Sequence, residues 1–206
     1  EGLTRPDGDT GKELFWQGDD GCLYTPGETV PSEVTHLTAR WQTPSYTVTY
    51  APGAYGEGTA FTAEKLHGTA LILSTGGFTR TGYTQVGWAT VDGGAKDFAF
   101  DSVYTADEAI TLYPVWEEKG GYTVKWDTAG GTVIADKTNV KWNDRVLAGV
   151  ALPQRSGWEC TGFWYGERAV TEMTAYADLV ENDTVKAVTL TARWADIAAP
   201  TVTGLV

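Results

Sequence analysis

The sequence has few of the residues from which disulfide frameworks, metal centres and catalytic triads are built. Its 206 residues include two cysteines and two histidines. Cys22 and Cys160 fall in different repeats and suit neither a disulfide framework nor a zinc site, so we expect two buried, unpaired thiols. His36 and His67 occupy non-equivalent positions, and the repeats supply no partners for a histidine-based triad or metal centre.

Positive charge is also scarce. Fifteen lysines and arginines against 27 aspartates and glutamates give a formal net charge of −12. A field of this sign repels the phosphate backbone and anionic headgroups, so we expect no nucleic-acid partner. The acidity is typical of a soluble surface that repels its own copies, and we expect a monomer.

Long hydrophobic runs are missing. No segment approaches the roughly 18 consecutive apolar residues of a membrane span, and we expect no membrane insertion in this region. The chain does not open with a basic segment followed by an apolar one, so a signal peptide or anchor would lie outside it. We therefore interpret the sequence as a fragment. Its 42% apolar residues suffice to build folded cores.

The chain does contain an internal repeat, because three sequence blocks recur in the same order with a period of about 76 residues. This period exceeds the roughly 20–50 residues of solenoid and propeller units, so each repeat is expected to be a small domain. The blocks lie at residues 46–50 and 122–126, at 80–88 and 155–163, and at 36–41, 111–116 and 189–194.

The repeat predicts the domain boundaries. Residues 46–116 and 122–194 are expected to be complete repeats, and residues 1–42 the C-terminal half of a repeat whose opening strand is missing. Residues 195–206 are expected to be a linker and the start of a following module.

The opening block alternates strictly. Tyr46, Val48 and Tyr50 are expected to face one way and Thr47 and Thr49 the other. This two-residue period, rich in aromatic and β-branched residues, is typical of a half-buried β-strand. The aromatic residues of such strands are predicted to fill the cores of small domains that have no disulfide or metal to stabilise them.

The closing block alternates likewise, with Leu190, Ala192 and Trp194 predicted inward. Pro114 interrupts this block in the middle copy and is therefore predicted at a sheet edge or bulge. Helical signal is weak: the candidates are residues 62–67 and a short helix within 137–152.

These blocks resemble the Listeria–Bacteroides repeat family, the B-repeat type of internalin B. The family pattern is a Tyr-Thr-Val-Thr-aromatic strand, a Gly-Gly turn, a Gly-Tyr-Thr-x-x-Gly-Trp block and a closing Thr-Leu-Tyr-Ala-x-Trp. Three departures are visible: Phe163 replaces the tryptophan, residues 12–16 are one residue short and lack the glycine, and the middle repeat has an extended turn at residues 52–58.

The resemblance implies a mostly β fold (α+β, β-grasp-like), in a tandem array of compact repeat domains with at most one short helix each. It also implies a secreted protein or one held at the bacterial cell wall. The family pattern contains no catalytic residue, so the chain is expected not to be an enzyme. No catalytic, cofactor-binding or metal-binding residue is expected, and no cofactor.

Three functions stay open. The first is a structural spacer, the second an adhesive module that binds a host surface protein or a glycan, and the third an accessory domain of an extracellular enzyme. The aromatic residues would be stacking platforms if the ligand were a glycan, although their alternation favours a core. The adjacent acids Asp19 and Asp20, and Asp107 and Glu108, lack the spacing of a calcium loop and are interpreted as solvated charges.

Overall fold

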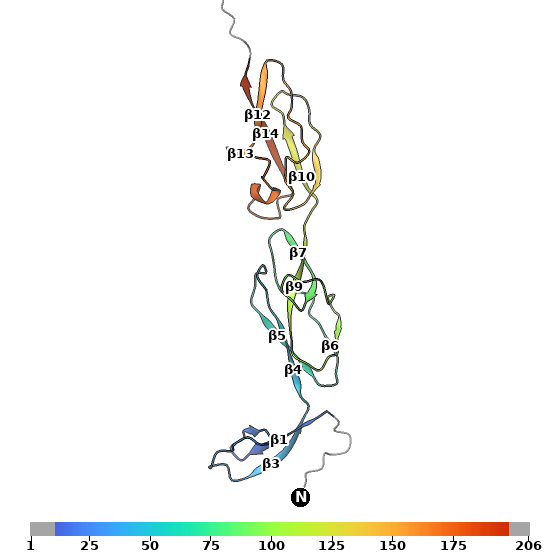
Figure 1. Cartoon of the computed structure of the whole chain (residues 1–206), viewed down its shortest axis with the longest axis vertical. Helices are drawn as coiled ribbons and strands as arrows, with labels where there is room; N and C mark the ends of the chain where they lie inside the picture. Colours follow the sequence, from blue (N-terminus) through green and yellow to red (C-terminus); the bar gives the residue numbers. More distant parts are fainter. Residues whose placement is uncertain (1–10, 198–206) are drawn as a thin grey trace, which may run out of the picture. The chain divides into compact units, whose positions relative to one another are not determined.

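The computed structural model describes residues 11–197, and over these residues the chain is mostly β-structure. Its strands form four sheets, in the orders β2-β1-β3, β5-β4-β9-β7, β6-β8 and β11-β10-β14-β12-β13 (Figure 1). The bounds are β1 Glu13–Gly18, β2 Leu23–Tyr24, β3 Leu37–Gln42, β4 Ser45–Tyr50, β5 Phe61–Leu66, β6 Leu71–Ile72, β7 Tyr83–Ala89, β8 Val103–Tyr104, β9 Ile110–Glu118, β10 Tyr122–Asp127, β11 Lys137–Val140, β12 Trp158–Tyr165, β13 Arg168–Val170 and β14 Ala187–Asp196, with one 3-10 helix, η1, at Tyr176–Leu179.

The Cα positions cluster into two compact units. One comprises residues 1–78 and 85–115, and the other residues 79–84 and 116–206. The strands of each sheet come from one predicted repeat, whereas each compact unit includes parts of two predicted repeats. The domain boundaries stay a prediction. Strand β14 continues to Asp196, past the predicted boundary at 194. The predicted half repeat and the predicted C-terminal module both extend beyond the described residues, at 1–10 and 198–206 respectively.

The sheet of residues 122–196 joins the two ends of a repeat at its centre. Its opening strand β10 lies parallel to its closing strand β14, with register pairs from Thr123 with Ala187 to Asp127 with Thr191. Strand β12 pairs antiparallel with the other edge of β14, and β11 and β13 flank the sheet. Figure 1 shows β10, β14 and β12 along one another. A mixed sheet of this kind fits the small β-rich domain that the motifs imply.

The alternation of the blocks is confirmed by burial. Val48, Tyr50, Leu190 and Ala192 are at most 2% exposed. The neighbouring threonines are partly or fully exposed, as the period of two requires. In the last sheet the core adds Trp142, Val146 and Leu147 from a loop and Tyr176 and Leu179 from η1.

Both candidate helices are wrong. Residues 61–66 form strand β5, which pairs with β4 over its whole length. Residues 142–147 form turns with a few local hydrogen bonds, such as that from the Ala148 N–H to the Arg145 carbonyl (3.3 Å), and their other backbone hydrogen bonds join a distant segment. The Val146 N–H donates to the Thr174 carbonyl (3.0 Å), and the Ala177 N–H donates to the Trp142 carbonyl (2.9 Å). Tertiary pairing therefore replaces the helical pattern in both places.

Pro114 does not lie at a sheet edge, because β9 is flanked by β4 and β7 and runs through it unbroken. Its effect is on the parallel pairing. The Ala51 N–H donates to the Leu112 carbonyl (2.9 Å), and the next bond of the ladder would need an N–H at position 114. Proline has none, and the register pairs between β4 and β9 end at Leu112. The ladder in this repeat is therefore shorter than the one between β10 and β14.

The sheet of β1, β2 and β3 reproduces the β13-β12-β14 half of the complete repeat. Trp16 pairs with Ala39 as Phe163 pairs with Ala192. Strand β12 has a register shift between Cys160 and Gly162, where Gly162 has φ +128°, whereas β1 pairs with β3 without interruption. The missing residue noticed in the sequence is thus the extra residue of a β-bulge.

Candidate functional site

A group of polar side chains in the first unit surrounds Asp107. Strand β5 directs Lys65 into the protein, where its side chain is 0% exposed, and its Nζ lies 2.5 Å from Asp107 Oδ1. The Gly68 N–H donates to the same oxygen (2.9 Å). His67 Nδ1 lies 3.3 Å from Asp107 Oδ2 and 3.0 Å from the Tyr46 hydroxyl. A lysine, an aspartate, a histidine and a tyrosine are thus in direct contact.

The contacts within this group hold strand β5 to the loop that carries Asp107. The Lys65 ammonium, followed by the Gly68 N–H, holds the pKa of Asp107 below its ordinary value, because both stabilise the carboxylate. A Cβ placed on Gly11 would come within 2.6 Å of the His67 ring, so the backbone of Gly11 packs against that ring. The side chains satisfy one another, and the arrangement explains how Lys65 is buried as a cation.

A second acid, Asp183, has the same role in the other unit. Its Oδ2 accepts hydrogen bonds from Lys119 Nζ (2.7 Å) and from the Gly82 N–H (2.9 Å). The Lys119 N–H in turn donates to the Gly82 carbonyl (2.8 Å). Lys119, ahead of the Gly82 N–H, keeps the pKa of Asp183 below its ordinary value. This explains why residues 79–84 cluster with the second unit.

The two acids occupy related places in their repeats. Asp107 shortly precedes Ile110, and Asp183 shortly precedes Val188, and these two apolar residues both pair with the valine of an opening strand. Each acid therefore lies in the loop before the closing strand and binds a lysine. Sequence reasoning missed Asp183, Lys65 and Lys119. The only available signal was the recurrence of an acid just before the closing strand.

The other acids singled out in the sequence are also engaged. Asp19 accepts from the Thr35 hydroxyl (2.6 Å) and backbone N–H, and Asp20 accepts from the Tyr24 hydroxyl (2.5 Å). These hydrogen bonds lower the pKa of both carboxyls, the contacts with Thr35 and Tyr24 being the largest causes. Asp19, Asp20 and Asp107 are all exposed, so these carboxyls reach solvent as the sequence predicts and have hydrogen-bond partners within their own unit as well.

The two histidines and the two cysteines do not come together. His36 is 86% exposed, 3.8 Å from Asp19, while His67 belongs to the Asp107 group. Both cysteines are free, but Cys22 is exposed and Cys160 half-buried, so the predicted burial is wrong. Cys22 lies just before β2, whereas Cys160 on β12 packs against the core of the last sheet.

Several large aromatic side chains of the complete repeats are interior. Trp88 is 0% exposed, its indole N–H donates to the Ser74 carbonyl (2.7 Å), and its ring lies 4.7 Å from that of Tyr50. In the last sheet Tyr122 stacks on Tyr176 at 4.5 Å, and Phe163 is 1% exposed. The prediction that the recurring aromatic residues form the cores is confirmed for these positions.

Aromatic rings nearer the surface are covered by arginines. The guanidinium of Arg155 lies 4.6 Å from the centre of the Trp158 ring, and that of Arg193 lies 4.0 Å from the Trp164 ring. Arg80 covers Tyr83 in the same way at 3.7 Å. Cation–π contacts of this kind occupy the faces that a sugar ring would need for stacking.

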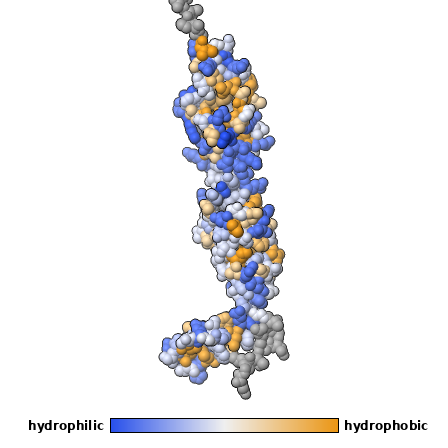
Figure 2. Space-filling model, in the orientation of Figure 1, coloured by the Kyte–Doolittle hydropathy of each residue, from blue (hydrophilic) through white to orange (hydrophobic). Residues whose placement is uncertain are grey.

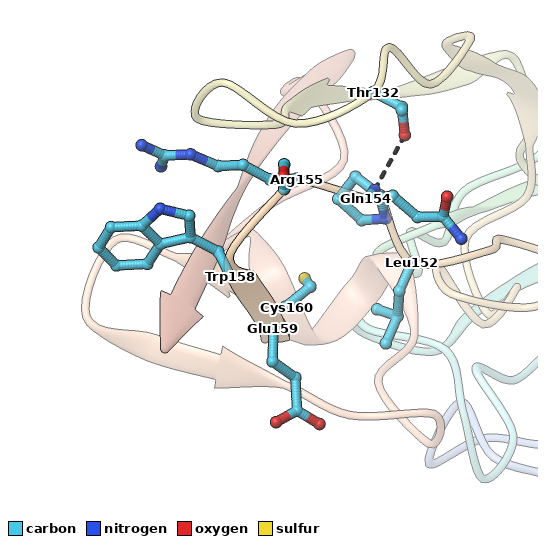
Figure 3. A pocket seen from close by; sticks show the side chains of 9 residues that line it. Thr132, Leu152, Gln154, Arg155, Trp158, Glu159 and Cys160 are labelled. Atoms are coloured by element: carbon cyan, nitrogen blue, oxygen red, sulfur yellow. Dashed lines mark hydrogen bonds between the residues drawn. The ribbon is translucent and has the colours of Figure 1, made fainter. Parts of the chain in front are cut away.

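An open hollow of about 630 Å³ lies beside Trp158. Figure 3 shows Arg155 next to Trp158 at one side of the hollow and Gln154 on another, where the Gln154 N–H donates to the Thr132 hydroxyl (3.0 Å). Glu159 and Cys160 complete its wall. Polar and apolar groups line the hollow in similar measure, without a cluster of acids and bases that would suit proton transfer.

Residues 11–197 contain neither a candidate metal centre nor a candidate membrane-spanning helix. Nowhere in this range do three or more histidines, cysteines, aspartates or glutamates gather so that they could hold a metal ion. The range also holds no helix with the length and apolar character needed to cross a bilayer.

Comparison with known proteins agrees with the motifs. Residues 46–115 match the family model of the Listeria-Bacteroides repeat domain. No curated protein and no solved structure shows a significant match to the chain. The matched repeat family occurs in bacterial surface proteins. The segment 46–115 is therefore a repeat domain of the Listeria-Bacteroides family.

Proposed function

We propose that this chain is a non-catalytic, load-bearing spacer in a secreted or cell-surface bacterial protein. The observation that carries the proposal is the parallel pairing of the first and last strands of each complete repeat. A spacer between a cell and a distal module is pulled from its two ends, and these are the strands to which such a pull is applied.

The geometry of the last sheet determines how a pull acts. A force on the start of β10 and on the end of β14 draws the two parallel strands past each other along their length. Five register pairs, from Thr123 with Ala187 to Asp127 with Thr191, then resist together. Peeling the same strands apart from one end would break the pairs one after another. Resistance in shear requires many hydrogen bonds to yield at once, which slows forced unfolding.

Several contacts support a structural function. The recurring aromatic residues are buried against one another, and the acids with lowered pKa bind lysines, hydroxyls or backbone N–H groups of their own unit. These groups are used in holding the repeats closed. The arginine-covered rings count against glycan stacking as the main function, and an adhesive or enzyme-accessory function is the alternative.

Single-molecule pulling tests the proposal. In one arm the 206-residue chain is held by its ends. In the other it is held through Thr123→Cys and Ala187→Cys, after Cys22 and Cys160 have been replaced by serine. These two positions are register partners at one end of the ladder, so the second arm peels the strands apart. We expect the first arm to need a several-fold higher force to open residues 122–194. Equal forces in the two arms would refute load bearing by this ladder.

A further inference from the structure

A glycine in the turn before β1, and another in the turn before β7, packs against an aromatic ring of the next predicted repeat. Gly82 has φ +78°, and a Cβ placed on it would overlap the Trp142 ring. Gly11 has φ +97°, and a Cβ there would come within 2.6 Å of the His67 ring. Glycine is required twice over, because it adopts a left-handed backbone without strain and has no Cβ to hold the ring away. Each contact lies inside one of the two compact units.

A backbone hydrogen bond accompanies the ring contact in both places. The His67 N–H donates to the Pro44 carbonyl (2.8 Å), and the Trp142 N–H donates to the Lys119 carbonyl (3.0 Å). Pro44 and Lys119 stand at the same place in the repeat, three positions after the closing tryptophans at 41 and 116. The glycine and the carbonyl therefore belong to one repeat and its linker, and the ring and the N–H to the repeat that follows.

The ring connects this contact to the opening strand of its own repeat. The centre of the Trp142 ring lies 5.8 Å from that of Tyr122, with the planes inclined by 52°. His67 meets the equivalent tyrosine, Tyr46, at 6.1 Å and 42°. Trp142 is 7% exposed and belongs to the core of the last sheet. Because packed cores transmit displacements, a shift of this ring is expected to reach β10.

The last repeat contains the glycine half of the same arrangement. Gly157 also has φ +78°, and its carbonyl accepts from the Ile197 N–H (3.1 Å). The Gly82 carbonyl accepts from the Lys119 N–H in the same way (2.8 Å). A Cβ on Gly157, however, would meet no atom of residues 11–197 within 4 Å. The turn therefore takes its left-handed conformation without a ring against it, and the ring contact at Gly82 is an addition to it.

We propose that this contact is a docking junction through which each repeat stabilises the one after it. The docking surface is the ring and N–H of His67 or Trp142, and the partner that it fits is the left-handed glycine turn of the preceding repeat. Figure 2 shows mainly hydrophilic surface, on the face in view, where the chain passes from β9 into β10. We therefore assign the coupling to these contacts and not to a broad apolar interface. The junction does not depend on the load-bearing function proposed above.

Hydrogen exchange of the 206-residue chain tests the junction with a matched pair of variants. Gly82→Ala and Gly157→Ala introduce the same strain, because both glycines have φ +78°. Strain alone weakens the repeat that contains the substituted residue. The methyl group added at Gly82 also displaces the Trp142 ring, and so weakens the following repeat. We expect Gly82→Ala to speed exchange of the β10 amides by about ten-fold or more and to shift the indole N–H resonance of Trp142. Gly157→Ala should leave exchange of the β4 amides unchanged.

Two outcomes overturn the proposal. One is a Gly82→Ala chain in which β10 exchange and the Trp142 indole resonance both stay as in the native chain. The other is faster β4 exchange in Gly157→Ala, because an effect on another repeat without a ring in contact has a different source. If alanine unfolds the middle repeat, Gly82→Asn and Gly157→Asn repeat the comparison with less strain, since asparagine tolerates the left-handed region. The same asymmetry is expected, and its absence overturns the junction equally.

Discussion

At the scale of single residues, the depth of burial distinguishes tryptophans that the sequence treats alike. Trp88 is fully buried, packed against Tyr50 with the two rings tilted, and hydrogen-bonded, whereas Trp116 and Trp194 at the ends of the closing blocks are only half-buried. The indole N–H of Trp194 nevertheless donates to the Thr128 carbonyl (3.1 Å) and so ties the closing strand to the turn after β10. The largest cost of truncation therefore belongs at Trp88.

Trp88→Ala should lower the free energy of unfolding of the repeat by about 3–5 kcal/mol, because a large cavity and an unpaired Ser74 carbonyl remain. Trp194→Ala should cost less, since part of the ring already faces solvent. Denaturant unfolding of the 206-residue chain, followed by hydrogen exchange resolved by repeat, measures both. A larger loss for Trp194→Ala than for Trp88→Ala would contradict the burial argument.

A buried tyrosine provides a pH-dependent test. Burial raises the pKa of Tyr176 to about 12, and its hydroxyl donates to the Val185 carbonyl (3.0 Å). A raised pKa means that the folded protein keeps this proton while the unfolded chain loses it near the ordinary value of 10. Stability contributed by Tyr176 is therefore complete below about pH 10 and is lost as the pH rises toward about 12. Melting temperatures across this range should fall less steeply for Tyr176→Phe than for the native chain.

At the scale of elements, one backbone N–H separates the two parallel ladders. Ala192 occupies the place in β14 that Pro114 occupies in β9, and the pairing of Asp127 with Thr191 needs its N–H. Where proline stands, the pairing with the opening strand stops at Leu112. The residue type at this position thus sets where each ladder ends, whereas the pair of Thr123 with Ala187 at the start of the longer ladder has no counterpart between β4 and β9 for another reason.

Ala192→Pro should destabilise residues 122–194 by about 1–3 kcal/mol or more, because a carbonyl of β10 loses its donor inside the sheet. Ala192→Gly is the control: it removes the methyl group but keeps the N–H, and should cost no more than about 1 kcal/mol. Hydrogen exchange of the β10 amides measures the difference. If the proline variant exchanged no faster than the glycine variant, the ladder would not depend on this bond.

The elements also show how far sequence reasoning reaches. The strands were predictable because their period of two is local, and the β-bulge left a trace as one residue missing from β1. The helical candidates failed because residues 61–66 and 142–147 take their hydrogen bonds from segments that no local pattern reveals. The Asp107 and Asp183 groups were missed for the same reason, since Lys65 and Lys119 lie 42 and 64 positions from their acids.

At the scale of the whole molecule, acidification should destabilise the folded state, because it protonates carboxylates that folding stabilises. Folding lowers the pKa of several carboxyls below the ordinary 3.8 of aspartate, among them Asp107 and Asp183, where a lysine is the first cause. A lowered pKa contributes stability that is fully present above the ordinary value and is lost as the pH falls through the folded value. The melting temperature should therefore drop on acidification below about pH 4, and Asp183→Asn should flatten that drop for residues 116–196. An unchanged acid profile in this variant would show that Asp183 does not take part.

The unequal ladders have a consequence for a chain under rising tension. In the proposed spacer, we expect the repeat whose pairing stops before Pro114 to unfold first and the repeat with five register pairs to follow at a higher force. Each unfolding event would release about 70 residues, which adds roughly 230–250 Å of length at full extension. Such a spacer would lengthen under a transient force in two ordered steps and shorten again when each repeat refolds.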